Sequence, residues 1–482
     1  MPARFETLHR QLGETFFDPV EPAKFPQHIL RYRNRRAAET IGLDGLRDAQ
    51  WVDHFGRFQP FPGSFEQPLA LRYHGHQFRV YNPDIGDGRG FLFAQIRDLT
   101  DGRLLDMGTK GSGRTPYSRS GDGRLTLKGG VREVLATARL EALGVYTSKS
   151  LSLIETGEAL ERHDEPSPTR SAVLVRLSHS HIRIGSFQRL AVTEDQVGLE
   201  RLIDYCCQHY YPEITDESTA GRALSLFSRI TAESARLCAQ WMVAGFVHGV
   251  LNTDNLNITG ESFDYGPYRF LPIYEPGFTA AYFDETGLYA YGRQPEAVHW
   301  NLCRLAECLL GLVDRDALTE ALAIFDQVFE PALHDMFCRR LGLVGAGQKV
   351  AELVRAVFQY LHASKQQPDQ FFHDWLGGAG SAERAMAGPD GALYRSAGFE
   401  PVQQALAGFG AHPAVAEALV TDIMQNPRPV TLLYDEIEAL WQRIAEDDDW
   451  AGFEQKLAET EALRGAMAPF FVDQPRPWPI GI

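Results

Sequence analysis

The sequence predicts an α+β fold with two lobes, in which a mixed α/β lobe is followed by a mainly helical one. Three observations predict it: a strand pair between Phe91 and Lys110, a helix directly after that pair, and long helical patterns beyond Leu199. A chain of 482 residues is also long enough for two or three packed units with a cleft between them. We therefore expect an N-terminal lobe over residues 1–188, which includes an N-terminal extension and binds nucleotide, and a helical C-terminal lobe over residues 189–482.

The strands of the first lobe are indicated by short apolar runs. The run FLFAQI (91–96) is followed by the turn Asp101-Gly102, and residues 104–110 alternate well enough to form its partner strand. The resulting hairpin ends on Lys110. Two later runs, 151–154 and 172–177, also predict strands, and Arg176 lies near the end of the second.

Helical periodicity begins directly after this hairpin. Apolar residues recur at helical spacing from Val131 to Ala142, with Glu133 in the first turns, and Gly144 is placed to end the helix in a left-handed conformation. In the second half, the stretch from Ala223 to Ala244 predicts a long amphipathic helix. The glycine-rich run from Gly377 to Gly398 predicts a surface connection.

Composition excludes several classes of function. Lys and Arg total 47 against 63 Asp and Glu, and a net charge of −16 opposes attraction to nucleic acid or to anionic lipid. No stretch approaches the roughly 20 apolar residues of a membrane span, and the N-terminus lacks the apolar segment of a signal peptide. We expect a cytoplasmic protein without a nucleic-acid or membrane partner. Its six cysteines form no C-x-x-C pair and predict buried free thiols: Cys206, Cys207, Cys238, Cys303, Cys308 and Cys338.

The sharpest chemical signal is the run HGVLNTDN (248–255), followed by Asp264-Tyr265-Gly266. In kinase-type phosphotransferases a His opens the catalytic loop, an Asp two residues later accepts the hydroxyl proton, and an Asn and a D-F-G aspartate hold metal. Here His248, Asn255 and Asp264 fit three of these places. The fourth is Val250, which cannot accept a proton. The loop is therefore that of a pseudokinase, and we expect a protein-kinase-like fold.

Upstream residues follow the same template in the same order. A glycine-rich turn spans Gly86 to Gly90, Lys110 ends a strand, and Glu133 lies on a helix from which it can pair with that lysine. No G-x-x-x-x-G-K-[ST] motif occurs, which excludes a P-loop. His74 and His76 form an H-x-H pattern without a cluster of acidic or Cys ligands, so we expect them to be structural. On these residues alone, a phosphotransferase and a non-catalytic nucleotide-binding scaffold both stay open.

Several longer motifs resemble one known family. They are HGHQFRVYNPDIGDGR (74–89), KGSGRTPYSRSGDGR (110–124), VRLSHSHIRIGSF (175–187), HGVLNTDN with DYGP (248–267), and YEPGFT with YAYGRQPEAVHWNLCRLAECLL (274–310). In this order they are similar to the selenoprotein O family of protein adenylyltransferases, also called the YdiU family. The similarity covers roughly residues 70 to 310 and is far more specific than any single motif.

The resemblance implies a kinase fold that binds ATP in reversed orientation and transfers AMP to Ser, Thr or Tyr hydroxyls of proteins. It implies Asp254 as the general base, Asn255 and Asp264 as ligands of Mg²⁺ or Mn²⁺, and Glu133 as the ion-pair partner of Lys110. The positions that match nucleotide-binding residues are Gly86, Gly88, Arg89, Lys110, Asp122, Gly123, Arg176, Arg183 and Asp264. AMP transfer releases pyrophosphate, so positive charge is needed at the β- and γ-phosphates, and these arginines and the lysine can supply it.

The last third of the chain carries fewer of the expected motifs. An Asn-Pro-x-Tyr-Val-x-Arg-Asn type segment is expected there, and only Asn426-Pro427-Arg428-Pro429 remains of it. Many family members end with a cysteine or selenocysteine, whereas this chain ends QPRPWPIGI and its last cysteine is Cys338. We therefore expect a divergent C-terminal region and no redox switch through a C-terminal thiol.

Overall fold

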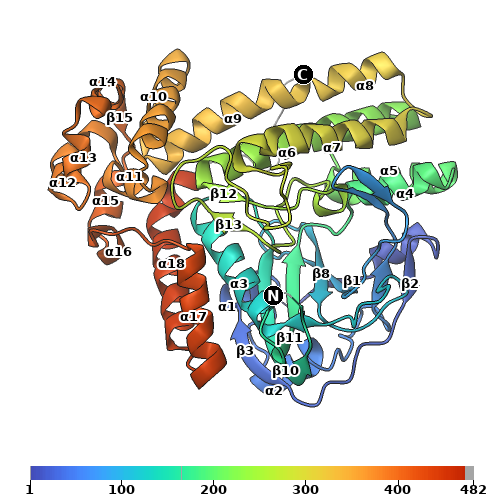
Figure 1. The fold of residues 1–482 in the computed structure, drawn as a ribbon. Coiled ribbons are helices and arrows are strands. Elements are labelled where there is room, and N and C mark those ends of the chain that lie inside the picture. The colour runs from blue at the N-terminus through green and yellow to red at the C-terminus, as the bar shows by residue number, and fades with distance from the viewer. Residues whose placement is uncertain (1, 164, 473–482) are drawn as a thin grey trace.

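A nine-stranded antiparallel sheet forms the centre of the first half of the chain (Figure 1). The structure is a computed structural model that describes residues 2–163 and 165–472. It is α+β, as predicted. The strand order is β2 (Phe17–Pro19), β4 (Leu69–Leu71), β7 (Leu92–Arg97), β8 (Leu104–Lys110), β11 (Thr169–Ser178), β10 (Lys149–Leu160) and β3 (Ile29–Arg33), with β1 (Phe5–Glu6) on β7 and β9 (Leu125–Thr126) on β11.

The predicted hairpin lies at the centre of this sheet. Strands β7 and β8 pair in antiparallel register from Arg97 opposite Leu104 to Leu92 opposite Gly108, so the turn falls at Asp101-Gly102 as expected. Gly102 takes the positive φ of 78° that the turn requires. Strand β8 then pairs with β11, which places the end carrying Lys110 beside Leu174. The two further strands predicted from sequence are confirmed within β10 and β11.

Helix α3 (Leu127–Ala142) packs against the sheet and is the helix predicted after the hairpin. The hydroxyl of Thr126 accepts a hydrogen bond from the Gly129 amide and caps the helix start. Gly144 has a φ of 76° directly after the helix end, which confirms its predicted role. Helix α18 (Ala451–Phe471) lies along α3, so a helix from the end of the described residues packs against the first half of the chain (Figure 1).

Long helices form the second half. Helix α6 (Thr219–Ala244) contains the predicted helical stretch and is capped by the Ser218 hydroxyl. It runs beside the helices α7 (Gln294–Leu309) and α9 (Ile324–Arg340) in Figure 1. Gly245 ends α6 in a left-handed conformation, and the chain then enters β12 (Phe246–Val247), which pairs with β13 (Arg269–Phe270). The motif HGVLNTDN lies between these two short strands, so their pairing fixes both ends of the loop.

The remaining helices complete the fold. They are α1 (Arg35–Thr40), α2 (Asp48–Phe55), α4 (Ile184–Val192), α5 (Gln196–Tyr210), α8 (Arg315–Leu322), α10 (Gln348–Ser364), α11 (Pro368–Asp374), α12 (Ala382–Ala387), α13 (Gly391–Tyr394), α14 (Glu400–Leu406), α15 (Val415–Leu419), α16 (Asp422–Gln425) and α17 (Tyr434–Asp447). The short strands are β5 (Gly75–Gln77), β6 (Val80–Asn82), β14 (Leu343–Val344) and β15 (Gly410–Ala411). The division at residue 188 stays a prediction.

The prediction that residues 377–398 form a surface connection is only partly confirmed, because half of the run is exposed but much of it is helical. This run folds into the short helices η4 (Gly378–Ser381), α12 and α13, and Tyr394 is buried. The ring of Tyr394 packs edge-on against Trp375 at 5.5 Å, and Phe399 contacts both rings. The glycines indicated an irregular loop, but these aromatic contacts hold the run against the neighbouring core.

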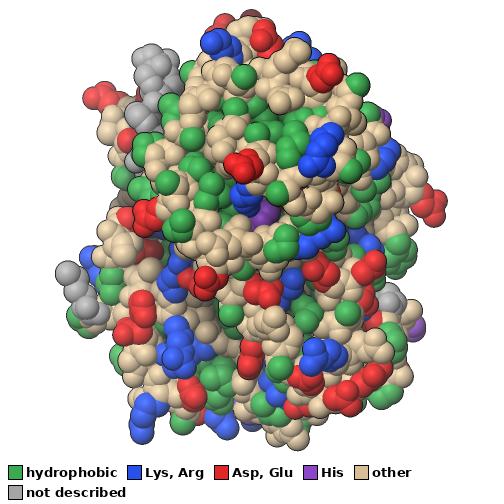
Figure 2. Space-filling model, turned by 90° about the vertical axis from the view of Figure 1, so that its left-hand side faces the viewer, with side chains coloured by type: hydrophobic (Ala, Val, Ile, Leu, Met, Phe, Trp, Pro, Cys, Tyr) green, Lys and Arg blue, Asp and Glu red, His purple; other side chains and the backbone are tan. Residues whose placement is uncertain are grey.

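The surface carries charges of both signs, and five of the six cysteines are buried free thiols as predicted. On the face shown in Figure 2, acidic and basic side chains are interspersed and no broad basic surface is visible. All six cysteines are free thiols; Cys303 is half-buried and the others are buried. Among residues 2–163 and 165–472, no helix has the length and apolar character needed to cross a membrane. The terminal run QPRPWPIGI lies outside the described residues.

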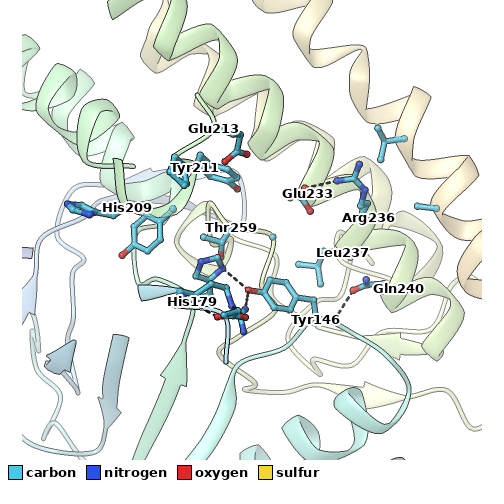
Figure 3. A pocket seen from close by; sticks show the side chains of 18 of the residues that line it. Tyr146, His179, His209, Tyr211, Glu213, Glu233, Arg236, Leu237, Gln240 and Thr259 are labelled. Carbon is cyan, nitrogen blue, oxygen red and sulfur yellow. Dashed lines mark hydrogen bonds and ion pairs between the residues drawn. The ribbon is translucent and has the colours of Figure 1, made fainter. Parts of the chain in front are cut away.

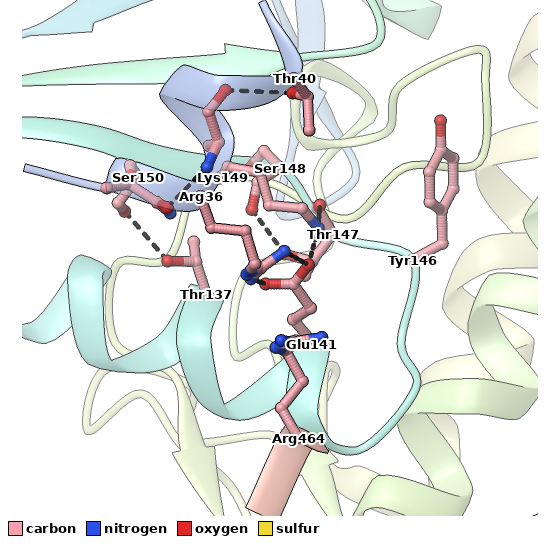
Figure 4. A network of polar contacts seen from close by, with 12 residues as sticks. Arg36, Thr40, Thr137, Glu141, Tyr146, Thr147, Ser148, Lys149, Ser150 and Arg464 are labelled. Atoms are coloured by element: carbon pink, nitrogen blue, oxygen red, sulfur yellow. Dashed lines mark hydrogen bonds and ion pairs between the residues drawn. The ribbon is translucent and has the colours of Figure 1, made fainter. Parts of the chain in front are cut away.

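A network of charged side chains at the C-terminal end of α3 connects this helix with α1, β10 and α18 (Figure 4). Glu141 pairs with Arg36 of α1, and its carboxylate lies 3.2 Å from the Lys149 ammonium at the start of β10. Arg464 of α18 adds a further positive charge near Glu141 and pairs with Glu461 at 2.6 Å. Burial alone would raise the pKa of Glu141, but Lys149 and Arg36 hold it at about 2.

Candidate active site

A cleft of about 710 Å³ opens between the sheet and the loops that precede the helical half. Its walls are the glycine turn at residues 86–90, the end of β8, the end of β11, and a second strap formed by residues 117–124. All nine residues predicted to bind nucleotide line it, namely Gly86, Gly88, Arg89, Lys110, Asp122, Gly123, Arg176, Arg183 and Asp264. Segments separated by up to 178 positions in the sequence therefore meet in one cavity.

Four charged side chains form a closed cluster at the inner end of the cleft. The Lys110 ammonium lies 2.6 Å from the Glu133 carboxylate and 2.8 Å from that of Asp264. Arg176 approaches the same two carboxylates at 3.4 and 3.1 Å. The predicted pairing of Glu133 with Lys110 is thus present, and Asp264 joins it. Burial would raise the pKa of Asp264, but Lys110 and Arg176 hold it well below its ordinary value.

Arg183 is a separate cation at the start of α4. Its guanidinium lies 3.3 Å from the Asp87 carboxylate and 4.2 Å from the centre of the Tyr73 ring. The ring of Phe263 lies 5.2 Å away on another side, so apolar faces hold this buried charge in place. Because one carboxylate at 3.3 Å leaves several of its five N–H donors available, Arg183 can also bind an anion.

Close backbone approach explains the glycines of this cleft. A Cβ at Gly90 would lie 2.0 Å from the carbonyl oxygen of Thr109, and one at Gly123 would lie 2.3 Å from the backbone of Gly113. Gly123 also has a φ of 70°. The neighbouring Asp122 lies at the rim and pairs with Arg162 at 2.8 Å, so its carboxylate anchors the strap.

The loop that carries Asp254 and Asn255 lies behind Arg183. The Arg183 guanidinium donates to the backbone carbonyl of Asp254 at 3.5 Å. Burial raises the pKa of the Asp254 carboxyl to about 6, although Arg183 opposes the rise. Its Oδ1 atom is buried and accepts no hydrogen bond within the part of the chain that the structure describes. Such a carboxylate is suited to accept a proton, because its pKa lies near neutral pH.

The hairpin of β5 and β6 holds this loop, and sequence reasoning missed its contribution. The Thr253 hydroxyl accepts from the His76 amide at 2.7 Å and donates to Gln188 at 2.6 Å. The side chain of Gln77 hydrogen-bonds the Asp254 carboxylate, while its own oxygen accepts from Asn82 at 3.0 Å. Nothing in the motif HGHQFRVYN predicted contact with residues 177 positions later in the chain.

The histidines of these motifs have structural partners. The ring of His76 shares a hydrogen bond of 2.7 Å with Gln188, and that of His74 one of 2.6 Å with Tyr81. The ring of His248 lies 3.1 Å from the carbonyl oxygen of Phe263. Within residues 2–163 and 165–472 no group of three or more His, Cys, Asp or Glu side chains could hold a metal ion.

The residues present nevertheless fit a magnesium ion bound together with a nucleotide. Asn255 donates its Nδ2 to the Val250 carbonyl at 3.0 Å, which leaves its amide oxygen as a possible ligand. Asp264 has a φ of 65°, which is uncommon for a residue other than glycine, and this backbone carries its carboxylate into the cleft. One amide oxygen and one carboxylate suit Mg²⁺, which takes its other oxygen ligands from phosphates and water.

The sequence of this chain matches a known protein family. The family described as protein adenylyltransferase SelO matches residues 1–461. The chain belongs to the SelO family. This confirms the resemblance drawn from the motifs of residues 74–310, and the family description implies a nucleotide and a protein as the two substrates.

Curated relatives from cyanobacteria agree with the SelO assignment. The protein nucleotidyltransferase YdiU of Synechocystis sp. is 43% identical over 481 residues, which cover 95% of this chain and 98% of that protein. The protein of the same name from Gloeobacter violaceus is 45% identical, and 93% of each chain is covered. That from Trichodesmium erythraeum is 50% identical over 72% of this chain and 73% of its own.

The family match also covers most of the last third of the chain. It extends to residue 461, so the missing Asn-Pro-x-Tyr-Val-x-Arg-Asn type segment does not place this region outside the family. The expected divergence of the C-terminal region within the family stays a prediction.

Proposed function

We propose that this chain is a protein adenylyltransferase that transfers AMP from ATP to Ser, Thr or Tyr hydroxyls of other proteins. The observation that carries the proposal is the concentration of Lys110, Arg176 and Arg183 at the inner wall of the cleft, together with a buried carboxylate at Asp254 and a valine at position 250. The proposal includes a two-lobed fold of the protein-kinase type, with the sheet and α3 in one lobe and the helices from α5 onward in the other.

The cations favour a nucleotide whose triphosphate points inward. In this pose Arg176 and Arg183 contact β- and γ-phosphate oxygens, and the glycine turn at residues 86–90 packs along the nucleotide. The α-phosphorus then faces the acceptor. Guanidinium groups stay charged and can grip phosphate oxygens through two parallel hydrogen bonds, so they stabilise the charge that develops on departing pyrophosphate.

Asp254 supplies the base in this proposal. The acceptor hydroxyl donates its proton to the Asp254 carboxylate while its oxygen bonds to the α-phosphorus. The bond between that phosphorus and the oxygen bridging to the β-phosphate breaks, and pyrophosphate leaves. Gln77 orients the carboxylate through its side-chain hydrogen bond. Asn255 and Asp264 would hold Mg²⁺ or Mn²⁺, which when bound neutralises phosphate charge.

The experiment that tests this function uses ATP labelled separately on the α- and γ-phosphates, with the intact protein and a mixture of acceptor proteins. Label from the α-position alone is expected to reach protein. Label from the γ-position alone would instead identify a phosphotransferase, which the valine at position 250 argues against. No transfer from either position would identify a nucleotide-binding scaffold, a role that has no need of a buried carboxylate beside a metal ligand.

A further inference from the structure

A second cavity, of about 630 Å³, lies apart from the nucleotide cleft (Figure 3). It is enclosed by the β7–β8 turn, the end of α5, the middle of α6 and the middle of α9. None of its lining residues also lines the cleft. Its volume lies within the range of about 300–1,000 Å³ that is typical of sites for small organic molecules.

Aromatic and aliphatic side chains form one part of the wall. Tyr146 and Tyr211 lie at opposite sides of the space in Figure 3, with Leu237 on the α6 side. The Tyr146 hydroxyl shares a hydrogen bond of 2.7 Å with the His179 ring and accepts one of 2.9 Å from Arg103. The ring orientation of Tyr146 is therefore fixed before any ligand binds. Fixed aromatic faces favour a flat, apolar ligand.

Arginines and acceptors both line the cavity, and on the side of α6 and α9 two acceptors favour a ligand that donates hydrogen bonds. Gln327 and Pro331 of α9 both line the cavity. Because Pro331 has no N–H, it cannot donate the helical hydrogen bond that the backbone carbonyl of Gln327 would otherwise accept. Glu233 of α6 pairs with Arg236 at 2.6 Å. Burial nevertheless raises the pKa of Glu233, because the pairing offsets only part of the desolvation of its carboxylate. An additional positive charge beside Glu233 would stabilise its ionised form.

The cavity also contacts the segments that carry the candidate active-site residues. Thr259 and Gly260 line it, and they lie between Asn255 and Asp264 in the chain. A Cβ at Gly260 would lie 2.8 Å from the backbone oxygen of Glu233, so this segment is pressed against α6. On the other wall, the His179 amide donates to the Glu261 carboxylate at 2.8 Å. The two segments are thus linked at the edge of the cavity.

From this arrangement we infer a binding site for a small cationic aromatic amine, with the ring between Tyr146 and Tyr211 and the ammonium beside Glu233. Binding of this ligand changes the affinity of the nucleotide cleft for ATP, because the ligand contacts the segment between Asn255 and Asp264 directly. The site takes a metabolite-sized effector and does not take part in group transfer. The inference does not depend on which phosphate the enzyme transfers, since it concerns ligand binding and nucleotide affinity.

The test uses three indole probes, which are tryptamine with a cationic side chain, indole without a side chain, and indole-3-acetate with an anionic side chain. Calorimetry on the full chain is expected to give tryptamine a Kd on the order of 1 mM, with indole weaker and indole-3-acetate weaker than tryptamine by roughly tenfold. Ala332→Trp places a ring in the cavity from α9 and should abolish tryptamine binding. Ala407→Trp, at an exposed position directly after α14, is the control and should bind tryptamine normally.

A second variant tests the charge preference without filling the space. Glu233→Gln should make tryptamine and indole bind alike, whereas Glu330→Gln, an exposed carboxylate on α9 outside the cavity, should leave the preference intact. Saturating tryptamine should change the Kd of ATP by about 5-fold in the wild-type chain and leave it unchanged in Ala332→Trp. A shift in ATP affinity that persists in Ala332→Trp would place the probe in the nucleotide cleft and overturn the inference. So would the absence of tryptamine binding, equal binding of all three probes, or tryptamine binding that leaves ATP affinity unchanged.

Discussion

Helix α3 carries two carboxylates that each meet two cations, and the two clusters differ in what surrounds them. Glu133 contacts Lys110 and Arg176, and its side chain is 1% exposed. Glu141, two turns further along, pairs with Arg36 and lies near Lys149, and it is 19% exposed. The Glu133 cluster borders the 710 Å³ cleft, whereas the Glu141 cluster joins α1, β10 and α18.

The two clusters differ in role: the charges around Glu133 are available to a ligand, whereas those around Glu141 connect segments of the fold. Around Glu133, the cations also face the cleft, so an incoming anion can replace part of their interaction with carboxylates. Around Glu141, the cations come from α1, β10 and α18, of which β10 and α18 pack against α3. Substitutions in the first cluster should therefore change catalysis, and substitutions in the second should change stability.

The largest effect is expected at Asp264. Asp264→Ala removes the carboxylate that Lys110 and Arg176 contact and that is proposed to hold the metal, and AMP transfer should fall at least about 10³-fold. ATP affinity should fall as well, with a higher magnesium requirement. Rates of α-label transfer and calorimetry measure both quantities. Asp316→Ala, an exposed carboxylate on α8, serves as control, and normal transfer by the Asp264 variant would remove it from the site.

A substitution at Asp254 should lower the rate of AMP transfer and leave nucleotide affinity nearly unchanged. Asp254→Asn keeps the size of the side chain but cannot accept the hydroxyl proton, so transfer should fall about 10²–10³-fold. Because the base assists only the transition state, the Kd of ATP should stay within about twofold of wild type. Single-turnover rates and calorimetry on the same preparations separate the two quantities. An unchanged rate would mean that the acceptor needs no base from this loop.

The arginine pair tests the orientation of the nucleotide. In wild type, AMP should bind much more weakly than ATP, because it lacks the two outer phosphates. Arg176→Ala with Arg183→Ala should weaken ATP about 10²-fold and leave AMP nearly unchanged, since each charge-assisted contact contributes about 1.5–3 kcal/mol. Calorimetry gives the ratio of the two affinities. The control is Arg315→Ala with Arg355→Ala on exposed helix faces, and an unaltered ATP:AMP ratio in the test pair would reject the inward triphosphate.

The smallest effect on activity and a clear effect on stability are expected at Glu141. Glu141→Gln should leave transfer within about twofold of wild type and lower the free energy of unfolding at pH 7 by about 2–3 kcal/mol. The folded-state pKa of about 2 lies below the ordinary value of 4.5, so this stabilisation is complete above pH 4.5 and is lost as the pH falls toward 2. Urea titrations of both proteins at pH 7 and pH 3 should show the difference shrinking by roughly half. A pH-independent difference would contradict the ionic account.

The sequence predicted the cluster around Glu133 but not the cluster around Glu141. Lys110, Glu133 and Asp264 stand at places that a known catalytic template defines, so their meeting was predictable before any fold was seen. Arg36 and Glu141 lie 105 positions apart in segments without a motif. They meet because α1 packs against β10, which itself packs against α3, and no local pattern encodes this packing.

The second cavity was invisible in the sequence for a related reason. Tyr146, Leu237 and Pro331 come from separate elements, and each is an ordinary residue in its own segment. The run from Gly377 to Gly398 shows the opposite error, since its glycines indicated a loop where aromatic packing decides the structure. Motifs predict a site when its chemistry is concentrated in short segments, whereas cavities depend on how helices are spaced.

The left-handed backbone of Asp264 sets backbone strain against ion pairing at one residue. A φ of 65° costs a non-glycine residue on the order of 1 kcal/mol, and glycine would adopt it without strain. Asp264→Gly would relieve this strain and also remove the carboxylate that meets Lys110 and Arg176. Each of these buried cations would then have one partner fewer, which costs more than the strain that is relieved. The ion pairs of the cleft therefore hold this residue in a backbone conformation that its own side chain disfavours.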